Sequence, residues 1–138
     1  MRVLAASFAL TSVFASGHPI PKAYTCEGSS LSPPLRWTAP PRGTRSFAIS
    51  VIDVDAGGFR HWLGWAIPAA ARRLAAGHRP AREARNSAGT PGYTGPCPPP
   101  GSGVHHYVFR LYALDTAAGP AFAGHVLAVA RLVGTFER

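Results

Sequence analysis

Proline and glycine occur along almost the whole of this sequence: 15 glycines and 14 prolines make up 29 of its 138 residues. Proline interrupts helices and glycine favours turns, so this density argues against a bundle of long helices. It favours short strands joined by tight turns. With 46% hydrophobic residues, a chain of this length can bury one core, and we predict a single mostly β domain over residues 1–138.

The sequence is strongly basic, with a formal net charge of +8 and a pI near 10.8. Its arginines are scattered, apart from a denser stretch between Arg72 and Arg85. Aromatic and basic residues do not alternate as they do along a base-stacking groove, so we expect no nucleic-acid partner. Attraction for small anions is expected instead. No run reaches the roughly 20 apolar residues that a membrane-spanning helix needs, so we expect no integral membrane association.

Three segments have the β-branched and aromatic residues of buried strands: 46–52 (SFAISVI), 61–67 (HWLGWAI) and 107–114 (YVFRLYAL). A shorter extended segment is expected at 10–15, followed by turn-rich chain over 17–41. The excursion 69–84 is expected to hold at most a short helical turn. Near the end, apolar residues recur at helical spacing before a glycine: Phe122, Val126, Val129, Val133 and then Gly134. This spacing predicts one C-terminal amphipathic helix packed on the sheets.

Two carboxylates, Asp53 and Asp55, follow the first predicted long strand, and His61 begins the next one. Carboxylates beside imidazoles can fix the tautomer of the ring and favour its cationic form, which donates to anions. The alternative is that both aspartates only cap a turn through bonds to their own backbone.

A second cluster joins the glycine- and proline-rich stretch 92–101 to the histidines that follow it. Proline stiffens such a loop and glycine lets its backbone approach a ligand. Because side chains alternate along a strand, His105 and Tyr107 should share one face and His106 the other. The alternatives are a buried, satisfied His105 and a solvent-facing His106.

The only cysteines, Cys26 and Cys97, have a spacing that fits neither a metal knuckle nor a dense disulfide framework. We expect two reduced, partly buried thiols, with a single bridge as the alternative. No metal and no cofactor are expected.

Several motifs occur together in one order: YTCEG (24–28), SPPLRW (32–37), DVDAGGFRHW (53–62), ARNSAG (84–89), GYTGPCPPPG (92–101), HHYVFRLYALD (105–115) and AGHVLAVARLVGTFER (123–138). In this order they resemble the phosphatidylethanolamine-binding protein family, in its bacterial and archaeal branch related to Raf kinase inhibitor protein. The resemblance implies a large and a smaller antiparallel sheet with a small anion pocket at one edge. It implies no enzyme activity.

The resemblance also assigns the pocket residues, which are Asp53, Asp55, His61, Gly95, Pro96, Cys97, Pro98, His105 and Tyr107. Three positions depart from the family pattern. Val54 replaces the proline between the two aspartates and Gly57 stands where Ala-Pro is usual, so the loop should be looser and the affinity lower. His106 replaces an arginine that braces a loop from outside the pocket.

The first residues allow two interpretations. Arg2, the apolar stretch after it and the small residues near Ala15 resemble a minimal signal peptide. Members of the family in the cytoplasm have the segment 10–21 as native structure, so we expect a strand there and a cytoplasmic protein. Residues 1–9 are then an extension or signal-like segment, and a cleaved signal peptide would instead make the protein periplasmic or secreted.

We therefore expect a non-catalytic binding module for phosphate-type groups or phospholipid head groups, with His61 and His105 as donors, Asp53 and Asp55 orienting them, and Tyr107 as a hydroxyl donor. It could also regulate a partner protein such as a protease or kinase. One alternative is a serine protease inhibitor that uses the exposed excursion 69–85. Another is a metal-assisted hydrolase with His61, His105 and an aspartate as ligands.

Overall fold

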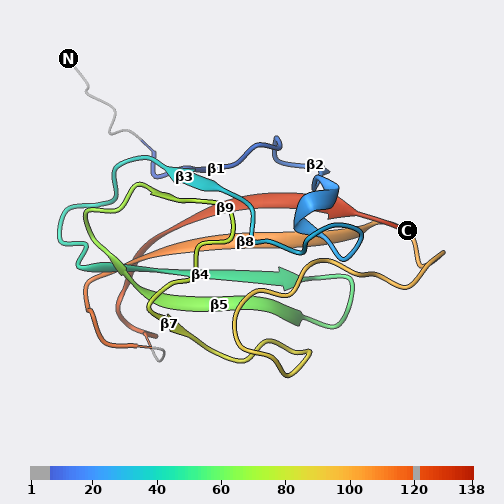
Figure 1. Ribbon diagram of the computed structural model, residues 1–138. Coiled ribbons are helices and arrows are strands. Elements are labelled where there is room, and N and C mark those ends of the chain that lie inside the picture. The colour runs from blue at the N-terminus through green and yellow to red at the C-terminus, as the bar shows by residue number, and fades with distance from the viewer. Residues whose placement is uncertain (1–6, 120–121) are drawn as a thin grey trace, which may run out of the picture.

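The computed structural model describes residues 7–119 and 122–138, which form two sheets packed face to face (Figure 1). The smaller sheet has the order β1-β3-β6, with β1 (Leu10–Thr11), β3 (Leu35–Trp37) and β6 (Arg73–Leu74). The larger sheet has the order β2-β9-β8-β4-β5-β7. Its strands are β2 (His18–Pro19), β4 (Ser46–Asp53), β5 (Phe59–Pro68), β7 (Arg82–Glu83), β8 (His105–Leu114) and β9 (Val126–Phe136).

The core lies between the two sheets. On β8 the odd-numbered residues from His105 to Ala113 are buried, and those from Tyr107 on belong to the core, as the alternation of strand side chains requires. Phe47 of β4 meets Trp37 of the smaller sheet edge to face, with ring centroids 5.3 Å apart. The three long predicted strands are thus confirmed as β4, β5 and β8, each slightly longer than expected.

The predicted C-terminal helix is wrong, because Val126–Phe136 is the strand β9. It pairs with β8 from Leu114 back to His105, and from Ala128 on its even-numbered residues turn toward the core. The spacing of the apolar residues at positions 122, 126, 129 and 133 also fits a helix. The strand is favoured because a period of two buries more side chains of this segment than the helical period would. In the described residues the only helix is the 3₁₀ turn η1 (Lys22–Tyr24).

Two smaller expectations need correction. The excursion 69–84 contains no helical turn and instead supplies the short strands β6 and β7. The segment 10–15 is a strand only at Leu10–Thr11, although Phe14 still enters the core. Of the extension expected at 1–9, residues 1–6 lie outside the described part of the chain. Among the described residues, no helix is long and apolar enough to cross a bilayer.

The strand order brings distant parts of the sequence to one end of the large sheet. β4 is antiparallel to both β5 and β8, so the end of β4 lies beside the starts of its two neighbours. Asp53 is in register with Phe59 on one side and with Tyr107 on the other. The residues singled out from the sequence therefore come together at this edge.

We expect Gly134→Ala to destabilise the protein by about 2 kcal/mol, because overpacking a core forces side chains and backbone to shift. A Cβ at Gly134 would collide with Ile20 and Phe14, which close the core over β9. Urea denaturation followed by tryptophan fluorescence measures the change. Thr135→Ala on the opposite face is the control and should have little effect; equal stability of Gly134→Ala and the native protein would contradict this packing.

Candidate functional site

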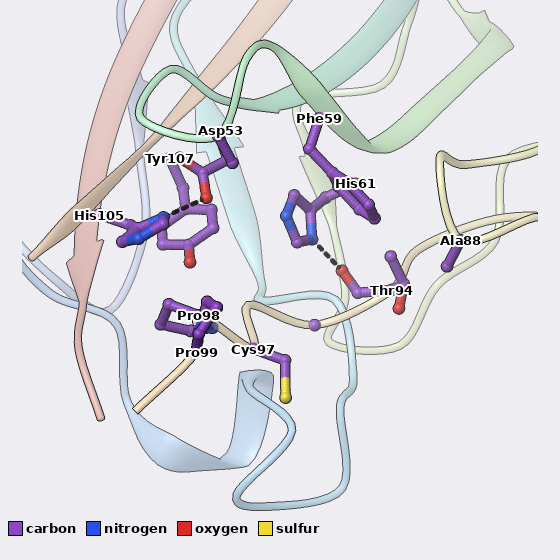
Figure 2. Close-up of a pocket in the computed structure, with 12 residues that line it drawn as sticks. Asp53, Phe59, His61, Ala88, Thr94, Cys97, Pro98, Pro99, His105 and Tyr107 are labelled. Carbon is purple, nitrogen blue, oxygen red and sulfur yellow. Dashed lines mark hydrogen bonds and ion pairs between the residues drawn. The ribbon is translucent and has the colours of Figure 1, made fainter. Parts of the chain in front are cut away.

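A pocket of about 300 Å³ opens at the end of the large sheet where β4, β5 and β8 meet (Figure 2). The strands supply its floor and the loop 94–99 supplies the opposite wall. It is lined by Asp53, Ala56, Phe59, His61, Ala88, Thr94, Gly95, Cys97, Pro98, Pro99, His105 and Tyr107. Seven of the nine residues expected from the sequence are in this lining, and Asp55 and Pro96 are not.

A chain of hydrogen bonds fixes His105 at the floor of the pocket. Its Nδ1 lies 2.6 Å from Oδ2 of the buried Asp53, and its Nε2 lies 3.0 Å from Oγ of Ser102. The other carboxylate oxygen of Asp53 accepts the backbone N–H of Asp55 at 2.8 Å. Asp53 therefore orients His105 as expected. Both ring nitrogens of His105 already have partners, so the ring offers no free N–H to a ligand, contrary to its expected role as a donor.

His61 has a different arrangement. Its Nδ1 lies 2.8 Å from the carbonyl oxygen of Thr94, and since a carbonyl can only accept, this nitrogen carries the hydrogen. The ring packs against Phe59 and meets Tyr107 edge to face, with centroids 4.7 and 5.2 Å away. Burial lowers the pKa of His61, and the hydrogen bond to Thr94 offsets only part of this effect. Near neutral pH the ring is therefore uncharged, and its Nε2 faces the pocket as an acceptor.

The hydroxyl of Tyr107 is the second polar group in the pocket that has an unused bonding capacity. It is buried, and within the described residues it has no hydrogen-bond partner. Burial, together with the negative charge of Asp53, raises the pKa of Tyr107, so the group stays a neutral phenol. A buried hydroxyl without a partner costs free energy, which a ligand oxygen accepting from it would recover.

Asp55 lies outside the pocket and does not orient a pocket histidine, which corrects the expectation. Its Oδ2 accepts the backbone N–H of His106 at 2.6 Å and lies 2.8 Å from the Nδ1 of that residue. These hydrogen bonds lower the pKa of Asp55. His106 is exposed while His105 and Tyr107 are buried, so the alternation predicted for this strand is confirmed. Asp55 and His106 therefore brace the 54–58 turn from the solvent side.

The wall opposite the floor is held to the N-terminal part of the chain. Cys97 forms a disulfide with Cys26, with their Cα atoms 5.3 Å apart, so the reduced state expected from the sequence is wrong. Pro96 turns away from the pocket, and its carbonyl accepts the N–H of Cys26 at 3.0 Å. Gly95 donates its N–H to Oγ of Ser30 at 2.9 Å. One covalent bond and these two hydrogen bonds therefore hold this wall to the N-terminal part of the chain.

Five lining residues were not predicted from the sequence: Ala56, Phe59, Ala88, Thr94 and Pro99. Phe59 and Thr94 lie within the two motifs that pointed to the site, but only the fold shows that they contact His61. Ala88 lies in the ARNSAG motif (84–89), which we did not assign to the pocket from the sequence. In the part of the chain that the structure describes, no three His, Cys, Asp or Glu side chains gather closely enough to hold a metal ion. The metal-assisted hydrolase therefore gains no support from the geometry.

We expect the double variant Cys26→Ser/Cys97→Ser to lose about 4 kcal/mol of unfolding free energy, because the bridge closes a loop of 71 residues in the unfolded chain. Urea denaturation gives the value. Native protein kept in a dithiol reductant is the control and should show the same loss. Unchanged denaturation midpoints in both samples would show that the bridge adds no stability.

Asp53→Ala is expected to cost about 3 kcal/mol of unfolding free energy, since it leaves Nδ1 of the buried His105 without an acceptor and removes the carboxylate that accepts the amide of Asp55. Thermal and urea denaturation measure the change. The matched control is Asp55→Ala, which removes an exposed carboxylate two residues away and should have a much smaller effect. If both variants lost the same free energy of unfolding, the buried contacts of Asp53 would stabilise the protein no more than the exposed contacts of Asp55.

Comparisons with known proteins identify the family and the fold. The family described as "Phosphatidylethanolamine-binding protein" matches residues 10–137. A UPF0098 protein of Pyrococcus horikoshii is 39% identical over 96% of this chain and 77% of its own length. A candidate lipoprotein of Mycobacterium tuberculosis, LppC, is 41% identical over 91% of this chain and 69% of its own length.

Two crystal structures have the same fold. A candidate phosphatidylethanolamine-binding protein homologue from Chlamydia trachomatis, CT736, has a TM-score of 0.88 and 34% identity, covering 97% of this chain and 99% of that one. E. coli YbcL, described as a new member of the mammalian family, has a TM-score of 0.87 and 31% identity, covering 96% of this chain and 99% of its own. The motifs, the paired sheets and these similarities together show that the chain belongs to the phosphatidylethanolamine-binding protein family, among its bacterial and archaeal homologues.

Proposed function

We propose that this protein is a non-catalytic binding module whose pocket takes a small oxyanion, either a phosphate-type group or a phosphorylated head group. The observation that carries the proposal is the buried hydroxyl of Tyr107, which points into the pocket and has no hydrogen-bond partner among residues 7–119 and 122–138 (Figure 2). A phenol can donate to an oxygen of the ligand, and Nε2 of His61 lies on the other side of the same space. A site with only two such groups should bind with modest affinity.

Protonation of His61 couples binding to pH. In its neutral form the ring presents a lone pair to the pocket, whereas the cationic form presents an N–H that donates to an anion. Because burial lowers the pKa of His61, most rings become charged only below the ordinary value of about 6.5. Affinity for an oxyanion should therefore rise as the pH falls below about 6.5, and weaken as the pH rises.

Isothermal titration calorimetry with inorganic phosphate and phosphoethanolamine between pH 5 and pH 8 tests the proposal. We expect binding that strengthens toward low pH and weakens about tenfold in Tyr107→Phe, which removes one hydrogen bond to the ligand. Tyr24→Phe is the matched control, because Tyr24 lies outside the pocket lining. If neither ligand bound at any pH, the proposal would fail.

We also propose that the protein works in an oxidising compartment. This differs from the cytoplasmic location that we expected from the sequence. Both cysteines of the disulfide are exposed, and exposed disulfides persist mainly outside the reducing cytosol. The similarity to a candidate mycobacterial lipoprotein supports the same location.

We do not extend the proposal to protease inhibition. The excursion 69–85 is held at two points, where β6 pairs with β3 and β7 pairs with β5. Arg79 also forms an ion pair with Glu83 at 2.7 Å. Residues 75–79 between these two points are exposed, but nothing in the described residues favours their insertion into a protease cleft. Regulation of a partner protein such as a kinase has no specific contact to support it.

A further inference from the structure

Between the adjoining rings of His61 and Tyr107, the pocket presents one hydrogen-bond donor and one acceptor rather than two donors. We propose that it selects oxyanions that carry an exchangeable proton of their own, namely hydrogen phosphate and its monoesters, over sulfate and phosphodiesters, which carry none. This inference rests on the proposed function and names the ligand class of that site. Since intact phospholipids are phosphodiesters, it assigns the pocket to free phosphomonoesters in preference to lipid head groups.

The acceptor is Nε2 of His61. The carbonyl of Thr94, 2.8 Å from Nδ1, requires the ring hydrogen on that side and leaves a lone pair on Nε2. No described residue forms a hydrogen bond with this Nε2. A ligand P–OH can donate to the lone pair, whereas a bare sulfate or diester oxygen places two lone pairs against each other.

The donor is the hydroxyl of Tyr107, whose ring meets that of His61 edge to face. It is buried and has no partner among the described residues, so it can donate to an unprotonated oxygen of the ligand. A hydrogen phosphate group offers both an acceptor oxygen and a P–OH on adjacent positions of one tetrahedron. Its hydrogen-bonding groups therefore complement those of the pocket.

The charged and titratable groups around His61 favour the same choice. Asp53 on β4 lines the floor, and His105 on β8 is bonded to it, so the nearest fixed negative charge belongs to Asp53. No lysine or arginine belongs to the described lining. Without a fixed cation, the pocket disfavours a ligand with two negative charges, and hydrogen bonding rather than charge decides what binds.

Calorimetric titration of the native protein at pH 6 with methyl phosphate, dimethyl phosphate and sulfate tests the inference. About half of a phosphomonoester carries its proton at this pH, while the other two ligands carry none. Dimethyl phosphate has one negative charge and sulfate has two, so together they control for charge. We expect methyl phosphate to bind about tenfold more tightly than either, with a smaller preference at pH 4.5, where more His61 rings supply the proton themselves.

Two variants separate the roles of the two groups. His61→Phe keeps an aromatic ring at this position but removes both ring nitrogens and with them the acceptor in the pocket, so the three ligands should come within about twofold of one another. Tyr107→Phe should weaken all three by a similar factor and keep their order.

Equal binding of the three ligands by the native protein would overturn the inference and leave the proposed function standing. Binding of none of them, nor of phosphate or phosphoethanolamine, would instead overturn the proposed function. The comparison in native protein needs no variant, so poor folding of His61→Phe would not prevent the test.

Discussion

The buried carboxylate of Asp53 is the contact on which the site depends. It accepts from Nδ1 of His105 on β8 and from the amide of Asp55 in the turn after β4. A carboxylate is buried at acceptable cost only when its oxygens are bonded, so these contacts hold the strand, the turn and the ring in one arrangement. The floor of the pocket follows from this geometry, and the disulfide then sets the distance of the opposite wall.

The sequence predicts the sheet well where buried and exposed side chains alternate along a strand. It predicts the sheet poorly where the spacing of apolar residues fits both a helix and a strand. On β8, the period of two correctly places His105 and Tyr107 on one face and His106 on the other. In β9 the apolar residues fit a helix and a strand about equally, and only pairing with β8 decides between them. Local pattern cannot contain that information, because the partner strand lies some twenty residues away.

Within the site, the sequence identifies the right residue types but not their contacts. Two aspartates two positions apart should share a face in a strand, yet β4 ends at Asp53 and the turn carries Asp55 outward to His106. The Cys26–Cys97 pairing likewise depends on the wall folding back onto the 3₁₀ turn. Both outcomes are set by the path of loops, for which side-chain alternation gives no rule.

The residues that give the chain its positive charge are not the residues that line the pocket. The arginines that give a net charge of +8 lie outside the described lining, whose polar groups are two histidines, a phenol, a threonine and one carboxylate. A surface surplus of positive charge can raise the local concentration of anions but cannot tell one from another. Discrimination must come from groups that touch the ligand, and in the proposed site these are a neutral imidazole and a neutral phenol beside the Asp53–His105 pair. Such a site distinguishes anions by where they carry hydrogen.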